Sequence, residues 1–323
     1  MKAIIYTHYG SPDVLKVAET EKPKPKENEV LVSVRAVSIN AADWHLLRAD
    51  PFIIRLMVGN LISPKYQILG ADIAGKVETV GKGVTLFRPG DEVFGDISAC
   101  GWGGLAEYAA VSENALVTKP VNISFEEAAA VPLAAVAALK GLRDMGKIEA
   151  GKSVLINGAS GGVGTFAVQI AKYFGAEVTA VCSSRNLDLV KSIGADNVVD
   201  YTHEDFTKNG KCYDLILAAN GYHSIWDYKR SLNPNGIYVA TGGTMPQIFQ
   251  GMLLGNLASL FGNKKLGSLA SFPDQKDLTF IKGLLEAGKV KPVIDRRFPF
   301  TETADGFRYL EEGHARGKIV ITI

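Results

Sequence analysis

The sequence is poor in cysteine, in net charge and in long apolar runs. It has three cysteines in 323 residues, at positions 100, 182 and 212, and none belongs to a Cys-x-x-Cys pair that would suggest a metal or redox site. Its 35 basic and 34 acidic side chains give a net charge of +1, which argues against nucleic acid as the main partner. The apolar stretch from Ile248 to Phe261 is too short to span a bilayer, so no integral membrane association is expected.

The first residues give no sign of export. Met1 to Tyr6 read as a short strand that turns at Gly10-Ser11-Pro12, without the long apolar region of a signal peptide. The widely separated cysteines fit a reducing compartment. We therefore expect a cytoplasmic protein.

Two kinds of pattern divide the chain. Up to residue 123, β-rich runs such as Val30 to Ile39 alternate with turns, which predicts a β domain. From the capping-box pattern Ser124-Phe-Glu-Glu127 onwards, apolar strands alternate with helices, which is typical of a doubly wound parallel sheet. After residue 271, two helices and a strand follow that could return to the first domain. The prediction is an α/β protein with one domain at 124–271 and the other formed by 1–123 and 272–323.

The strongest chemical signal is a glycine-rich turn between a buried strand and a helix. In Val154-Leu-Ile-Asn-Gly-Ala-Ser-Gly-Gly-Val-Gly164, Ala159, Gly161 and Gly164 take the three positions of the Gly-x-Gly-x-x-Gly pattern. A pyrophosphate must approach the backbone where side chains would block it, and a helix N-terminus offers it unpaired N–H groups and a positive dipole. The turn therefore predicts a dinucleotide site consisting of Ala159, Ser160, Gly161, Gly162, Val163 and Gly164.

The tip of the next strand indicates which dinucleotide is bound. The acidic residue that holds the ribose in NAD enzymes, about 20 residues after the turn, is missing, and Ser183, Ser184 and Arg185 stand there instead. A guanidinium can pair with a phosphate in bidentate fashion, so NADPH is favoured. The alternative is that Arg185 is a solvated loop charge and Asn186 only a helix N-cap.

Further short motifs follow one another at defined spacings. They are Asn40-Ala-Ala-Asp43, Gly70-Ala-Asp-Ile-Ala-Gly-Lys-Val77, Pro89-Gly-Asp-Glu-Val93, Ala106-Glu-Tyr108, Gly194-Ala-Asp196 and the segment from His314 to Lys318. Together with the glycine turn they resemble the medium-chain dehydrogenase/reductase superfamily, specifically its quinone oxidoreductase branch, over essentially the whole chain. The resemblance implies a Rossmann domain, a GroES-like β domain completed by the C-terminal segment, and a cofactor in the cleft between them.

The resemblance also indicates where a metal would be expected. Zinc-dependent relatives carry a cysteine before the Asn40 region, Gly-His-Glu in place of Gly70-Ala71-Asp72, and a four-cysteine loop near residue 100. These ligands are missing, and Cys100, His45 and Asp43 form an unconvincing set. We expect no zinc.

Without zinc, simple alcohol oxidation lacks its main electrostatic support. Hydride addition to a quinone or another conjugated carbonyl is easier, because the negative charge delocalises onto an oxygen that needs only hydrogen-bond donors or a proton source. The expected reaction is therefore hydride transfer from NADPH to such an acceptor. The alternatives are a 2-alkenal or enone double-bond reductase and, in another class, a protein that binds NADPH with little turnover.

The Asn-x-x-Asp element lies near the nicotinamide in this branch. The resemblance therefore places Asn40 in the substrate cleft as a donor, with Asp43 and Trp44 beside it, and Tyr66 could line the same cleft. From the residues alone, Asp43 could instead cap the following helix, while Trp44 and Tyr66 could simply be packed.

Further cofactor contacts are predicted after the later strands. Tyr201 matches a position beside the adenosine phosphate in relatives, and Asn220, Gly242 and Gly243 follow strands whose carboxyl ends should face the nicotinamide half. Lys318 either approaches the cofactor phosphate or is a solvated charge at the start of a strand. The resemblance also predicts a homodimer, with Lys265 to Ser271 as an edge strand between subunits.

Overall fold

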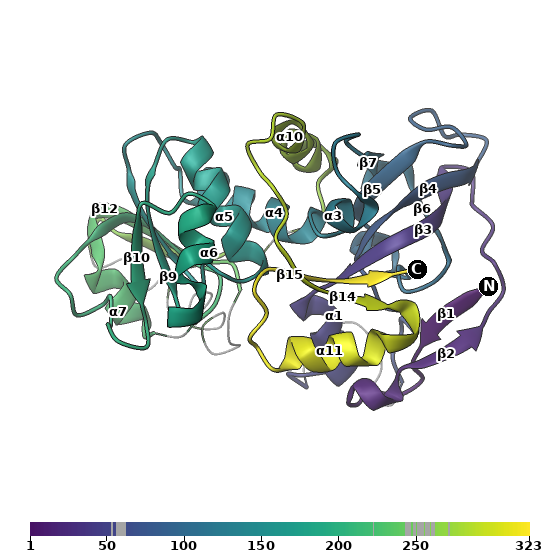
Figure 1. The fold of residues 1–323 in the computed structure, drawn as a ribbon, viewed down its shortest axis with the longest axis horizontal. Helices are drawn as coiled ribbons and strands as arrows, with labels where there is room; N and C mark the ends of the chain where they lie inside the picture. Colours follow the sequence, from purple (N-terminus) through teal and green to yellow (C-terminus); the bar gives the residue numbers. More distant parts are fainter. Residues whose placement is uncertain are drawn as a thin grey trace. The chain divides into compact units, whose positions relative to one another are not determined.

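The computed structural model of the chain is shown in Figure 1. The structure describes residues 1–323 except 53, 56–62, 222, 243–246, 248–249, 251–254, 256–258, 260–261 and 271. Gly243 and most of the apolar segment 248–261 therefore lie outside the described residues. Among the described helices, none combines the length and the apolar character that crossing a membrane requires.

The chain divides into two units. Unit 1 comprises Met1–Leu133, Phe272–Glu286 and Pro292–Ile323, and unit 2 comprises Ala134–Ser271 and Ala287–Lys291. Unit 1 therefore extends to Leu133, beyond the expected boundary at residue 123. Residues 287–291 were expected in the first domain but belong to unit 2.

Local contacts explain both differences. The capping box is present, since Ser124 Oγ accepts from Glu127 N at 3.1 Å and the Glu127 carboxylate accepts from Ser124 N at 2.8 Å. The helix that it begins, α3 (Phe125–Ala129), packs against strands of unit 1. At the other end, Gln169 of unit 2 exchanges two hydrogen bonds with the backbone of Lys291, at 2.8 and 2.9 Å.

Unit 1 is built on a seven-stranded sheet. Its neighbours are, in order, β14 (Ile294–Pro299), β15 (Lys318–Thr322), β3 (Glu29–Ile39), β4 (Asp72–Val80), β5 (Glu92–Asp96) and β7 (Val117–Thr118), and β6 (Tyr108–Ser112) also pairs with β3. A separate antiparallel pair consists of β1 (Lys2–Ile5) and β2 (Lys16–Glu19). The helices that the structure describes over their full length in this unit are α1 (Ala41–Arg48), α3, α10 (Gln275–Glu286) and α11 (Thr303–Glu311). Because β15 pairs with β3, the C-terminal segment completes this sheet.

Unit 2 contains a six-stranded parallel sheet. Its strands are β8 (Ser153–Asn157), β9 (Glu177–Cys182), β10 (Asn197–Asp200), β11 (Tyr213–Ala218), β12 (Leu232–Ala240) and β13 (Lys265–Ser268), in the order β10-β9-β8-β11-β12-β13. This is the order 3-2-1-4-5-6 of dinucleotide-binding doubly wound sheets. Val154, Leu155 and Ile156 of β8 are fully buried, as a strand covered on both faces requires. The predicted α/β fold class is confirmed.

The helices of unit 2 cover this sheet. α5 (Gly162–Tyr173) packs against β8 and β9, α6 (Leu187–Ser192) against β9 and β10, and α7 (Ile225–Arg230) against β12 (Figure 1). The helix α4 (Pro132–Leu139) spans the boundary between the units in sequence. The strand order changes direction between β8 and β11, and such a switch point is where ligands of open α/β sheets bind.

Candidate functional site

Three of the four glycines between positions 158 and 164, which follow β8, are under different constraints. Gly158 has a φ of +81°, and a Cβ there would lie 2.6 Å from the Cβ of Asn220. A Cβ on Gly164 would lie 2.1 Å from the carbonyl oxygen of Gly158. A Cβ on Gly161 would meet only that same oxygen, at 3.5 Å. The fold itself requires Gly158 and Gly164, whereas a Cβ on Gly161 would make one ordinary van der Waals contact with the described residues.

Gly161 lies at the N-terminus of α5. Gly161 is the N-cap residue, with an extended backbone (φ −84°, ψ −179°), and no side chain caps the helix. The first N–H groups of a helix have no partner within it, and they carry its positive dipole end. Bare backbone at such a position fits a pyrophosphate, and a side chain on Gly161 would project into the same space.

Backbone hydrogen bonds join the turn to the neighbouring strands of the switch point. Ala159 N donates to Val181 O of β9 at 3.0 Å, and Ala219 N, just after β11, donates to Asn157 O of β8 at 2.9 Å. The exposed Asn220 follows directly, and a Cβ on Gly242 would lie 2.7 Å from Ala219 O. The residues predicted from separate motifs thus lie along one edge of the sheet.

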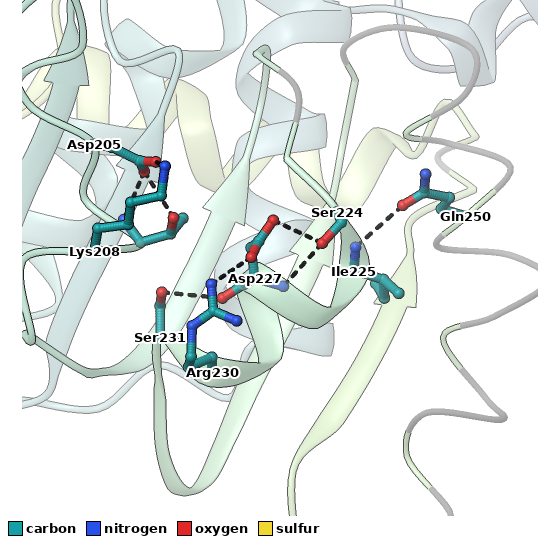
Figure 2. A network of polar contacts seen from close by, with 9 residues as sticks. Asp205, Lys208, Ser224, Ile225, Asp227, Arg230, Ser231 and Gln250 are labelled. Atoms are coloured by element: carbon teal, nitrogen blue, oxygen red, sulfur yellow. Dashed lines mark hydrogen bonds and ion pairs between the residues drawn. The ribbon is translucent and has the colours of Figure 1, made fainter.

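Helix α7 holds the side chain of Asn157 at this edge of the sheet. Its N-terminus is capped by Ser224, whose Oγ accepts from Asp227 N at 3.2 Å, and Arg230 pairs with the Asp227 carboxylate (Figure 2). The same helix carries the buried Tyr228, whose hydroxyl accepts from Asn157 Nδ2 at 3.0 Å. The hydroxyl of Tyr228 therefore holds the amide of Asn157, the last residue of β8 before the glycine turn.

The tip of β9 is rich in hydroxyl groups. Ser184 Oγ lies 3.0 Å from Thr202 Oγ1, Arg185 is exposed, and Tyr201 on the next loop is 61% exposed. A carboxylate that no motif indicated also lies here. Asp200 ends β10, and strand pairing places it beside Cys182 at the end of β9. Hydrogen bonds from Ser184 and Thr202 lower the pKa of this carboxyl. The carboxylate therefore stays ionised beside the hydroxyl groups that donate to it.

A second group of polar residues is buried in unit 1. Strand register brings it together, since Asp72 of β4 lies opposite Ser38 of β3 and Asp96 of β5. Lys318 begins β15, whose next residue pairs with the end of β3. Asp72 and Lys318 are 0% and 4% exposed, and their Oδ2 and Nζ atoms are 3.7 Å apart. The sequence analysis did not identify Asp72 as a site residue.

Asn40 links the members of this cluster. Its Nδ2 donates to Asp72 Oδ2 at 3.1 Å and to Ser38 O at 3.2 Å, and its Oδ1 accepts from Lys318 Nζ. Both amide hydrogens are therefore used inside the protein, so Asn40 does not offer the free donor that we expected for a substrate. The surroundings of Lys318 also rule out the solvated charge that was its alternative interpretation, and its contact with a coenzyme phosphate stays a prediction.

Burial shifts the pKa values of the charged pair in opposite directions. Desolvation raises the pKa of Asp72 and lowers that of Lys318, while the attraction between the two charges opposes both changes. Asp72 gains a further hydrogen bond from Leu133 N at 2.9 Å. Removing either partner of such a buried pair would leave the other charge uncompensated and destabilise the protein.

The other residues predicted around the substrate have partners within unit 1. The Asp43 carboxylate accepts from Asn40 N and Gly70 N, each at 2.8 Å, so it caps α1 and ties the loop before β4 to it. Trp44 packs against the core, and its Nε1 donates to Glu311 at 2.6 Å. Tyr66 is half-buried, with Lys65 Nζ 5.2 Å from its ring centroid. The structure thus supports the packing alternatives for Asp43 and Trp44.

Asp43 should make the stability of the protein depend on pH. Burial raises the pKa of this fully buried carboxyl from 3.8 to about 6 in the folded protein. The folded value lies above the unfolded one, so the contribution of Asp43 to stability is complete below about pH 4 and lost as the pH rises through 6, by about 3 kcal/mol. Urea unfolding between pH 4 and 7 should show a decline that is about 3 kcal/mol larger in the wild type than in Asp43→Asn, because the variant keeps only the other carboxyls of raised pKa, Asp72 and Asp96. A difference between the two proteins that stays constant over this range would refute the assignment.

The cluster does not provide a zinc site. Within the part of the chain that the structure describes, no group of three or more histidine, cysteine, aspartate or glutamate side chains is placed to hold a metal ion. Asp43 and Asp72 already accept hydrogen bonds at both carboxylate oxygens, and Lys318 places an ammonium group beside Asp72. The donor set around Asn40 therefore does not fit a catalytic zinc.

Known proteins resemble this chain over its full length. The family described as alcohol dehydrogenase GroES-like domain matches residues 26–121, and the family described as zinc-binding dehydrogenase matches residues 193–321. The chain is 35% identical to the chloroplast envelope quinone oxidoreductase homolog of Arabidopsis thaliana, over 99% of this chain and 98% of that protein. It is 37% identical to the chloroplastic NADPH-dependent alkenal/one oxidoreductase of Arabidopsis thaliana, over 99% of this chain and 79% of that protein.

A solved structure agrees with these matches. The quinone oxidoreductase from Coxiella burnetii superposes with a TM-score of 0.88 at 29% identity, and the match covers 100% of this chain and 99% of that one.

Proposed function

Because the chain belongs to the medium-chain dehydrogenase/reductase superfamily, in its quinone oxidoreductase-like branch, we propose that it is an NADPH-dependent oxidoreductase that reduces a quinone or another conjugated carbonyl. The observation that carries this proposal is the open backbone at Gly161, at the switch point of a sheet with dinucleotide-binding strand order. The names of the two plant relatives support the acceptor class. When bound, NADPH supplies the hydride.

The residues of unit 2 would bind the coenzyme in order along the sheet edge. The turn from Ala159 to Gly164 would hold the pyrophosphate, Ser183, Ser184, Arg185 and Tyr201 the phosphorylated ribose, and Asn220 and Gly242 the nicotinamide half. In unit 1, we propose that Asn40, Asp43, Trp44 and Tyr66 shape the substrate region. There the Asp72–Lys318 pair would hold Asn40 in place, because it engages both ends of its amide. We propose that no zinc takes part, and metal analysis of purified protein should find none in stoichiometric amount.

Arg185 should decide between the two nicotinamide coenzymes. Removing its guanidinium in Arg185→Ala removes a charge-assisted partner of the 2′-phosphate, which NADH lacks. The dissociation constant for NADPH should rise about 10- to 100-fold, while that for NADH changes little. Fluorescence titration with both coenzymes measures this. Equal losses for the two would place Arg185 away from the 2′-phosphate.

The acceptor class is tested by NADPH consumption with 1,4-quinones and with 2-alkenals. Turnover of quinones supports the proposal. Turnover of 2-alkenals alone would favour the double-bond reductase that the second plant relative is named for. Tight NADPH binding without oxidation across the whole panel would instead indicate a binding protein.

We also propose a homodimer and a cytoplasmic location. Within the described part of the sheet, β13 has β12 as its single neighbour, so its outer edge can pair with a second copy. Light scattering at micromolar concentration should then give twice the 34.6 kDa of one chain, and a monomer would contradict the dimer. Fluorescence microscopy of the tagged protein would test the location, and an organellar signal would contradict it.

A further inference from the structure

The coenzyme edge of unit 2 contains a buried amide that no motif identified. Asn186 follows Arg185 and is 4% exposed. Its Nδ2 lies 2.9 Å from Ser160 Oγ in the glycine turn and 3.2 Å from Ser183 Oγ at the tip of β9. It occupies the N-cap position of α6, but its side chain makes no capping bond. The alternative interpretation, in which Asn186 is only an N-cap, does not hold, because its amide is turned toward the two serines.

This amide fixes the hydrogen-bond polarity of both serines. A carboxamide nitrogen carries two hydrogens and accepts none, so each serine oxygen that receives one keeps its own hydrogen for another acceptor. Among the described residues, Asn186 Oδ1 has no hydrogen-bond partner. The reverse orientation of the amide would instead bury a two-hydrogen donor without an acceptor, which is the more costly arrangement.

The positions of Ser160 and Ser183 indicate which acceptors their hydroxyl hydrogens would meet. Ser160 precedes the N-cap of α5, where the open backbone at Gly161 fits a pyrophosphate. Ser183 lies at the end of β9, where the ribose phosphate is expected. Both sites call for donors to an anion, and hydrogen bonds to ionised acceptors are roughly twice as strong as neutral ones.

We propose that Asn186 is a positioning residue of the coenzyme site, which orients the Ser160 hydroxyl toward the pyrophosphate and the Ser183 hydroxyl toward the 2′-phosphate of NADPH. The inference rests on the proposed function, since it requires a bound dinucleotide. It extends that function by coupling two phosphate subsites through one amide that contacts neither phosphate.

The test is coenzyme titration of Asn186→Ala. The dissociation constant for NADPH should rise about 10- to 100-fold, and that for NADH less, because NADH retains only the pyrophosphate contact. Asn209→Ala is the matched control, since it also removes an amide that donates to a side chain, Glu204, but on an exposed loop. Its affinities should equal those of the wild type. Thermal unfolding of each variant shows whether the fold is kept.

A double-mutant cycle separates positioning from a general structural role. In a Ser160→Ala/Ser183→Ala background, the Asn186→Ala change should alter NADPH affinity less than about twofold, because the groups through which it acts are gone. The same loss in both backgrounds, or no loss in the wild-type background, would overturn the inference while leaving the coenzyme site intact. A wild-type protein that binds neither coenzyme would overturn the proposed function and the inference with it.

Discussion

Gly161→Val is expected to abolish measurable NADPH binding while the protein stays folded. A Cβ at this position meets only Gly158 O, at 3.5 Å, and the extended backbone suits a β-branched residue. The change should therefore lower the free energy of unfolding by no more than about 1 kcal/mol, the usual effect of a poor N-cap residue. The new side chain would occupy the space assigned to the pyrophosphate, so the dissociation constant should rise at least about 100-fold. Gly161→Ala should give an intermediate loss.

Gly164→Ala is the matched control for this experiment. Its Cβ would lie 2.1 Å from Gly158 O and 2.7 Å from the Cα of Ala159, so the turn itself must move. We expect a loss of stability of about 1–3 kcal/mol, as for other overpacked sites, with binding lost through the damaged turn. Coenzyme binding by Gly161→Val at wild-type affinity would show that the pyrophosphate does not lie there.

Lys318→Met is expected to lower the free energy of unfolding by about 3–5 kcal/mol, because it leaves the carboxylate of Asp72 buried without its counter-charge. The methionine nearly preserves the volume, so the loss reports the missing charge rather than a cavity. Asp72 has a raised pKa already, and in this variant its pKa should rise further. Stability should then recover as the pH falls from about 8 to about 4, because over this range the folded variant binds a proton at Asp72 and the unfolded chain does not. Urea unfolding at several pH values measures both effects.

The double variant Lys318→Met/Asp72→Asn tests the cause. It removes both charges, and Asn at 72 keeps an oxygen for Leu133 N, so most of the lost stability should return. A single variant that loses less than about 1 kcal/mol would mean that the pair is not buried as described.

Features carried by short stretches of sequence could be predicted. The fully apolar Val154-Leu155-Ile156 run before a glycine turn indicated a strand of a parallel sheet, and the structure places it at the centre of one. The glycines of the pattern, Gly161 and Gly164, indicated where a backbone must be approached closely. What the sequence did not show is that Gly164 is needed by the fold while Gly161 is not, because this depends on the distance from each to Gly158.

Features that depend on contacts between distant residues could not be predicted. Asp72 and Lys318 are far apart in sequence, and only the pairing of β15 with β3 and of β3 with β4 brings them together. Asn40 looked like a free donor because two of its partners, Asp72 and Lys318, come from distant segments. Asn186 looked like an N-cap because its neighbours in sequence suit one, whereas its side chain is bound to the glycine turn 26 residues earlier. In each case the local pattern was compatible with several roles, and tertiary contacts selected one.

The central claim is that the backbone of the glycine turn in unit 2 binds a phosphorylated nicotinamide coenzyme. Equilibrium titration of the unmodified protein with NADPH and with NADH, followed by coenzyme fluorescence, tests it most directly. The account predicts one site per chain and an NADPH affinity at least about tenfold above that for NADH. Absence of binding of either coenzyme would contradict it.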